Sequence, residues 1–160
     1  MRLTIIAIGR LKDGPERELA ARYQARFTEI GRRLGFRSLD IHDIAESRAR
    51  DAASRIAEEG AAIAARCPDQ ALLVALDEHG RALPSTGFAA LIGGWRDAGV
   101  AEAVFIIGGA DGLSPELRRK AKLTLAFGAA TWPHQMVRVM LLEQIYRAAT
   151  ILSGHPYHRA

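Results

Sequence analysis

The sequence predicts a single α/β domain in which helices cover a mostly parallel sheet. Segments typical of strands and of helices alternate five times along the 160 residues, and such alternation is characteristic of layered α/β folds. Two of the strand segments, 71–76 (ALLVAL) and 103–107 (AVFII), are wholly apolar, as expected of central parallel strands that are buried on both faces. A chain of this length is expected to form one domain, residues 1–160, around one substantial core.

The first half of the chain begins with a short apolar segment, 2–8 (RLTIIAI), which predicts a buried strand. Apolar residues then recur every three or four positions from 15 to 34, and this spacing predicts a helix that starts at a proline and stops at a glycine. The segment 36–42 (FRSLDIH) alternates apolar and polar residues, as in a strand nearer a sheet edge, with His42 facing solvent. The alanine-rich segment 46–66 predicts a peripheral helix.

The second half repeats the pattern of strand and helix three times. We expect strands at 71–76, 103–107 and 123–127, and helices at 85–98, from 115 onward and from 133 to 153. Ser114 supplies an N-cap hydroxyl for the second of these helices, and Pro115 suits its first turn. The last helix ends at Gly154 and leads into a polar tail, HPYHRA.

Composition excludes a membrane-spanning protein and favours the cytoplasm. No apolar run reaches the ~18 residues needed to cross a bilayer, and the N-terminal segment lacks the cleavage site of a signal peptide. The single cysteine, Cys67, cannot form an internal disulfide and has no cluster of metal ligands around it. These features fit a reducing compartment and a protein without a bound metal.

The net charge of +4 is concentrated in the C-terminal third of the chain. Residues 1–112 carry 15 basic and 16 acidic residues, whereas residues 113–160 carry 7 and 2. A basic region on a nearly neutral body favours an anionic partner, and nucleic acid is the commonest. The tail 155–159 (HPYHR) combines aromatic rings with cations, the composition that binds unstacked RNA bases and their phosphates.

Three loops follow predicted strands at the sheet edge where α/β proteins bind ligands: 76–80, 108–112 and 128–133. The second loop (GGADG) has three glycines, which let a ligand approach the backbone closely. Its spacing matches neither the dinucleotide-binding fingerprint nor the phosphate-binding P-loop. The third loop is built of small residues, and its backbone groups could bind an adenine edge. Residues 77–79 (DEH) suggest acid–base chemistry, but their side chains diverge, which favours a surface turn.

Three segments together resemble a known family: LDEHGR (76–81), FIIGGADGLS (105–114) and TWPHQMVRVMLLEQIYRAATILSGHPYHR (131–159). The family is that of the bacterial ribosomal large-subunit pseudouridine N3-methyltransferases, small members of the SPOUT class. The resemblance covers the whole chain and includes the opening segment RLTIIAIGRLK. Its most specific part is the pattern P-H-x-x-x-R-x-x-x-x-E-Q-x-Y-R-A, followed by a final P-Y-H-R.

The resemblance implies a SPOUT-type fold whose C-terminal part forms a deep trefoil knot, and a homodimer that acts on 23S rRNA in the assembled ribosome. It also implies S-adenosylmethionine as the methyl donor, bound mainly by backbone groups of the three loops. The cofactor-binding residues would be Leu76, Gly108, Phe127, Gly128, Ala129, Ala130, Thr131 and Trp132. The loop 127–130 is smaller than in relatives that place Ser or Lys there, which leaves the backbone to bind the cofactor.

The implied reaction is methylation at N3 of a pseudouridine, whose N3 proton must leave. A nearby cation favours the deprotonated base, and Arg138, one turn into the final helix, is the candidate. Glu143 and His158 are the candidates to accept the proton. The residues expected to contact the RNA, from the same or the other subunit, are Arg147, Tyr157, His158 and Arg159.

Alternatives remain open at this stage. A non-catalytic RNA-binding dimer could use the same basic tail beside a degenerate pocket. A Rossmann-type oxidoreductase is disfavoured by the glycine spacing, although Asp40 and Asp43 lie near the position of a ribose-binding acid. Glu143 and Arg147 could also form a structural pair on the helix, four residues apart.

Overall fold

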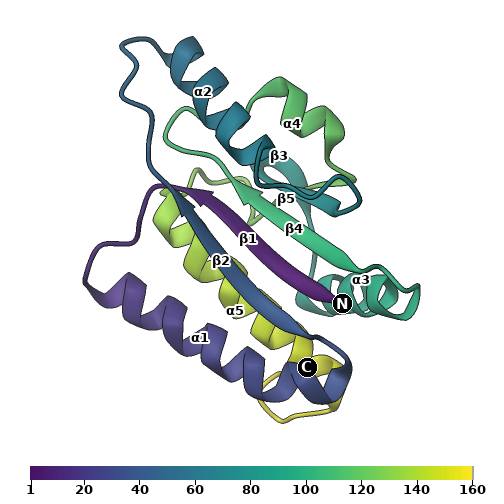
Figure 1. Cartoon of the computed structure of the whole chain (residues 1–160). Coiled ribbons are helices and arrows are strands. Elements are labelled where there is room, and N and C mark those ends of the chain that lie inside the picture. The colour runs from purple at the N-terminus through teal and green to yellow at the C-terminus, as the bar shows by residue number, and fades with distance from the viewer. Residues whose placement is uncertain (160) are drawn as a thin grey trace.

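The structure, a computed structural model that describes residues 1–159, is a parallel sheet between two layers of helices (Figure 1). The strands are β1 (Arg2–Ile8), β2 (Ser38–Ile44), β3 (Leu72–Ala82), β4 (Glu102–Ile107) and β5 (Leu123–Ala126). The helices are α1 (Pro15–Gly31), the short 3-10 helix η1 (Arg32–Leu34), α2 (Ala52–Ala64), α3 (Ser85–Asp97), α4 (Pro115–Lys120) and α5 (His134–Ser153). The strand order is β2-β1-β4-β3-β5, and the pairings between these strands are all parallel. The predicted α/β class is therefore confirmed.

Both faces of the sheet are buried, which explains the continuous apolar strands. Helices α1, α3 and α5 cover one face, and α2 and α4 lie on the other (Figure 1). Side chains alternate along a strand, so β1 sends Leu3 and Ile5 into the first layer and Ile6 and Ile8 into the second. The two layers account for strands with little polar alternation. Within residues 1–159, no helix is long and apolar enough to cross a bilayer.

The bounds of β2, α2 and β3 differ from the sequence predictions. β2 lies at the sheet edge and exposes His42, as predicted, but it starts and ends two residues later. α2 begins at Ala52 and not near residue 46. Asp51 determines this start, because its carboxylate accepts the N–H of Ser54 at 2.8 Å and caps the helix. One capping side chain thus outweighs the high helix propensity of the residues before it.

β3 is longer than predicted, and the turn expected at 77–80 is wrong. The strand continues through this segment by a bulge, where Leu76 and Arg81 both register with Leu125 of β5. Gly80 allows the close approach, because a Cβ there would lie 2.6 Å from the carbonyl carbon of Leu125. Residues 77–80 have no partner in the β3–β5 register and bulge out between these two positions, beside the carboxyl ends of the central strands.

A buried arginine joins the start of α5 to the carboxyl ends of β1 and β2. The side chain of Arg138 is 1% exposed. Its Nη1 donates to Oδ1 of Asp43 on β2 at 2.7 Å, and its Nη2 donates to the carbonyl oxygen of Gly9 at 2.7 Å. Burial lowers the pKa of Arg138, and the charge of the Asp43 carboxylate opposes that shift. The ion pair fixes the position of α5 against the edge of the sheet where ligands bind.

Removal of the Asp43 carboxylate should leave the charge of Arg138 buried and unpaired. We expect Asp43→Ala to lower the free energy of unfolding, measured by urea denaturation, by about 2–3 kcal/mol. The loss is smaller than for a fully buried pair because a third of the Asp43 side chain is exposed, at 33%.

Asp40→Ala is the matched control for this variant. Asp40 is an exposed acid on the same strand that accepts a hydrogen bond from the Ser38 hydroxyl. Its removal should change the free energy of unfolding by less than about 0.5 kcal/mol. An equal loss in the two variants would contradict a special role for the Arg138 pair.

Candidate functional site

A cavity of about 360 Å³ lies where the central strands β3 and β4 end. Three segments form its wall: residues 76–79 of β3, residues 107–113 after β4, and residues between 125 and 132 at the end of β5 and beyond. Arg118 of α4 and His134 and Val137 of α5 complete the wall. A volume of this size suits a small organic ligand. The structure thus places the three predicted loops around one cavity, at the edge where open α/β sheets bind their ligands.

Most of the residues expected to bind the cofactor line this cavity: Leu76, Gly108, Phe127, Gly128, Ala130, Thr131 and Trp132. Ala129 belongs to the same loop but is not part of the wall. The wall combines apolar side chains, such as those of Leu76 and Leu125, with the backbone of glycine and alanine residues. Such a surface suits a flat ring whose polar edge is bound by backbone N–H and C=O groups.

The glycine loop folds tightly against itself. A Cβ on Gly108 would lie 2.6 Å from the carbonyl carbon of Gly112 and 2.9 Å from the nitrogen of Leu113. The N–H of Gly112 donates to the carbonyl oxygen of Gly109 at 3.0 Å, and Gly112 has a φ of 83°. Glycine alone accommodates this close approach without strain. The backbone itself therefore forms this side of the cavity.

The loop after β5 is closed by two side-chain hydrogen bonds. The indole Nε1 of Trp132 donates to the carbonyl oxygen of Phe127 at 3.1 Å, which joins the two ends of the loop. The hydroxyl of Thr131 donates to Oε2 of Glu78 at 2.6 Å, which fastens the loop to β3. The small residues between these anchors leave the backbone open toward the cavity.

Polar side chains of β3 also line the cavity, although the sequence favoured a surface turn for them. Asp77 has a side chain that is 10% exposed, and its carboxylate accepts the backbone N–H of His79 at 2.9 Å and lies 3.4 Å from Nη1 of Arg118. Burial alone would raise the pKa of Asp77, but the hydrogen bonds from His79 and the charge of Arg118 bring it below its ordinary value. Residues 77–79 directly follow the predicted central strand 71–76, and this position in the sequence could have indicated that they line a ligand site.

Three further polar residues of the wall had no role in the sequence prediction: Asp111, Arg118 and His134. His134 Nε2 lies 3.5 Å from Oε1 of Glu46, so the first turn of α5 contacts the segment between β2 and α2. Within residues 1–159, no group of three or more His, Cys, Asp or Glu side chains is arranged to hold a metal ion.

The polar residues of α5 and of the tail form a second cluster. Nε of Arg147 donates to Oε1 of Glu143 at 2.9 Å, and the hydroxyl of Tyr157 donates to the same oxygen at 3.1 Å. The guanidinium of Arg147 lies over the Tyr157 ring, 4.9 Å from its centroid, and its Nη1 is 3.5 Å from Nδ1 of His158. Burial raises the pKa of Tyr157, and its contacts with Tyr23 and Glu143 add to the shift. The tail therefore folds back onto α5, with Arg159 exposed beyond it.

This polar cluster lies further along α5 than the cavity of the same chain. Val137 is the last residue of α5 in the cavity wall, and Glu143 and Arg147 follow six and ten positions later, which is about 9 and 15 Å at 1.5 Å per residue. Figure 1 shows the C-terminal tail beside the end of α1, where β1 begins and not where it ends. Arg138 is bonded to Asp43 and is not part of the cavity wall. None of Arg138, Glu143 and His158 thus reaches the cavity of its own chain.

Known proteins resemble this chain over its whole length. A family model described as "Predicted SPOUT methyltransferase" matches residues 1–158. The "Ribosomal RNA large subunit methyltransferase H" of Rhodopseudomonas palustris (strain BisB18) is 74% identical over 160 residues, which is all of both chains. Proteins of the same name from Bradyrhizobium sp. (strain ORS 278) and Nitrobacter winogradskyi are 73% and 71% identical and are covered, like this chain, to at least 99%. The chain therefore belongs to the SPOUT methyltransferase family.

Proposed function

We propose that this protein transfers a methyl group from S-adenosylmethionine to N3 of a pseudouridine in 23S rRNA. The observation that carries the proposal is the cavity walled by three segments at the carboxyl ends of parallel strands, with much of the wall formed by backbone. The names of its relatives, at 71–74% identity over nearly the full length, point to the RNA of the large ribosomal subunit. Action on the assembled ribosome, in the cytoplasm, follows from the same family resemblance.

The cofactor fits the residues that line the cavity. Backbone groups of the loops 108–112 and 127–132 would bind the adenine and the ribose, and the apolar side chain of Leu76 would pack against them. Bound S-adenosylmethionine supplies an electrophilic methyl group on a sulfonium sulfur. The protein's contribution is to orient that group toward the base and to exclude water, since positioning is most of what such a transfer requires.

The proton on N3 of the base must leave before or during transfer. Glu143 and His158 remain the candidates to accept it, and the charge of Arg147 beside them favours the deprotonated base. Arg138 has another role in this proposal. Because its guanidinium is buried against Asp43 and the carbonyl of Gly9, it positions α5 and does not contact the substrate.

We infer that the active site is completed by a second copy of the chain. Glu143 lies about 9 Å along α5 from Val137 of the cavity wall, and neither Glu143 nor His158 is part of that wall. The tail of a partner subunit must therefore approach the cavity if these two residues are to act there. Trp132, just before α5, and Met136, in its first turn, are 43% and 37% exposed and offer an apolar contact surface beside the cavity. The homodimer and the trefoil knot that the family resemblance implies stay predictions.

The alternatives differ from this proposal in measurable ways. A non-catalytic RNA-binding dimer would not bind S-adenosylmethionine. A dinucleotide-dependent oxidoreductase would need a free acid at the end of β2 for the ribose, whereas Asp43 at that position pairs with Arg138. That pairing disfavours the oxidoreductase.

Cofactor binding can be tested by isothermal titration with S-adenosylmethionine. We expect the wild-type protein to bind, and Gly108→Ala to weaken binding by at least about tenfold, because the added Cβ would collide with the backbone of Gly112. Gly94→Ala is the control, since a Cβ at Gly94 of α3 meets nothing within 4 Å. If the wild-type protein fails to bind at high micromolar cofactor, the methyltransferase proposal is wrong.

The role of the tail can be tested by deleting residues 155–160. We expect methyl transfer to vanish while cofactor affinity stays unchanged, because the tail lies far from the cavity of its own chain. The assay is transfer from labelled S-adenosylmethionine to ribosomes that lack the modification, followed by mapping of the methylated nucleotide. Tyr157→Phe serves as a milder variant that removes only the hydroxyl bonded to Glu143. Equal loss of binding and of transfer on deletion would show that the tail is merely structural.

A further inference from the structure

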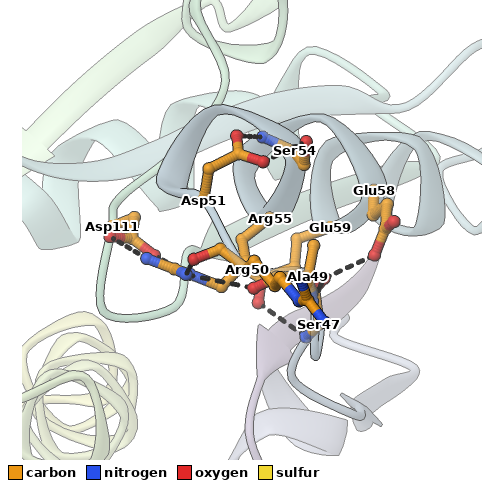
Figure 2. Close-up of polar contacts among 9 residues, drawn as sticks. All are labelled: Ser47, Ala49, Arg50, Asp51, Ser54, Arg55, Glu58, Glu59 and Asp111. Carbon is orange, nitrogen blue, oxygen red and sulfur yellow. Dashed lines mark hydrogen bonds and ion pairs between the residues drawn. The ribbon is translucent and has the colours of Figure 1, made fainter.

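The outer side of the glycine loop is bound by the first turns of α2 (Figure 2). Nε and Nη2 of Arg55 donate to the two carboxylate oxygens of Asp111 at 2.6 and 3.1 Å. Such a two-pronged pair fixes orientation as well as distance. The two side chains are only 29% and 26% exposed, so the pair is partly shielded from water. Asp111 lines the cavity, and Arg55 therefore contacts the cavity wall from behind.

The same guanidinium also fastens the segment that precedes α2. Nη1 of Arg55 donates to the carbonyl oxygens of Ala49 and Arg50 at 3.1 and 3.0 Å, as Figure 2 shows. All three nitrogens of the group are thus engaged. The cap from Asp51 to Ser54 fixes the start of the helix from which Arg55 projects. The guanidinium is consequently held in one orientation before any ligand arrives.

Glu59, one turn further along α2, reaches the same loop. Its side chain comes from a residue that is 6% exposed, and its Oε1 accepts the N–H of Ser47 at 2.9 Å. Its Oε2 has no hydrogen-bond partner among the described residues and lies 2.8 Å from the place where a Cβ of Gly109 would be. A buried carboxylate oxygen without a partner is unfavourable, and packing alone would be served better by an apolar residue. The contact with Gly109 indicates that Glu59 shapes the loop.

The loop therefore has two sides with different neighbours. Its inner side, from Gly108 to Gly112, faces the cavity. Its outer side contacts Arg55 and Glu59, which are four residues apart and so lie on one face of α2. A glycine-rich loop loses much conformational freedom when it is held in one shape. If the loop has its binding shape only part of the time, the affinity for the ligand falls in proportion to that fraction.

We propose that Arg55 and Glu59 are positioning residues of the methyltransferase, which hold the 108–112 loop in the shape that binds the cofactor. The proposal rests on the S-adenosylmethionine site proposed above. Neither residue touches the cavity. Both act through the loop, so their removal lowers cofactor affinity and leaves the transfer step itself intact.

The first test compares Arg55→Ala with Arg66→Ala. Arg66 follows the end of α2 and donates only locally, to the carbonyl oxygen of Ala62, so it controls for the loss of one arginine. We expect Arg55→Ala to raise the Kd for S-adenosylmethionine and its KM about tenfold, with kcat at saturating cofactor and the melting temperature close to wild type. Arg55→Lys keeps the positive charge but cannot form the two-pronged pair with Asp111, and should raise the Kd by a smaller factor. Glu59→Asp, which withdraws the carboxylate from Gly109, should raise it as well.

A second measurement does not depend on the cofactor. Hydrogen exchange of the backbone amides of 108–112 in the unliganded protein should be faster in Arg55→Ala than in wild type, and unchanged in Arg66→Ala. Unchanged exchange and unchanged Kd in Arg55→Ala would overturn the proposal, as would a fall in kcat without a rise in KM. Failure of the wild-type protein to bind S-adenosylmethionine would instead overturn the proposed function, and the exchange data would still decide whether Arg55 orders the loop.

Discussion

The buried contact of Arg138 with Asp43 and the carbonyl of Gly9 is the interaction on which the arrangement of the site depends. It joins the ends of β1 and β2 to the first turns of α5, and α5 begins in the cavity wall. A charge this deeply buried is tolerated only with a partner. These contacts hold the guanidinium in place, and they therefore hold α5 against the ends of β1 and β2. The family motif suggests that Arg138 is a catalytic cation. Its buried contacts indicate instead that it positions α5.

Much of the fold follows from sequence patterns because both faces of the sheet are buried. The apolar segments at 71–76 and 103–107 predict central strands, and Ser114 and Pro115 mark a helix start; the structure has all of these. The patterns fail where one side chain decides. Asp51 sets the start of α2 by capping it, and Gly80 lets β3 continue through a polar segment that resembles a turn. Propensity averages over many residues and cannot register such single contacts.

The site was predictable in its position and less so in its parts. Strand ends identify the three loops, because parallel strands present their carboxyl ends at one edge. The ion pairs of Asp77 and Asp111 were not predicted, since their partners, Arg118 and Arg55, are distant in the chain. The polar residues of α5 were expected beside the cofactor, but only His134 and Val137 of this helix line the cavity of their own chain. Periodicity shows which residues share a helix face and gives no information on which end meets a ligand.

The parallel pairing of β1 with β4 also has a consequence for how the chain folds. Arg2 lies opposite Glu102 in the sheet, so β1 cannot pair with β4 until the ribosome has added about a hundred more residues. At synthesis rates of about 5–20 residues per second, that delay is roughly 5–20 s. The face of the sheet that receives Leu141, Leu142 and Ile145 stays open longer still, because α5 is made last. Formation of such distant contacts is slow. The nascent chain can thus pair β1 with β2 early, but β1 lacks its second neighbour until β4 has been made, and the core closes only once α5 has been made.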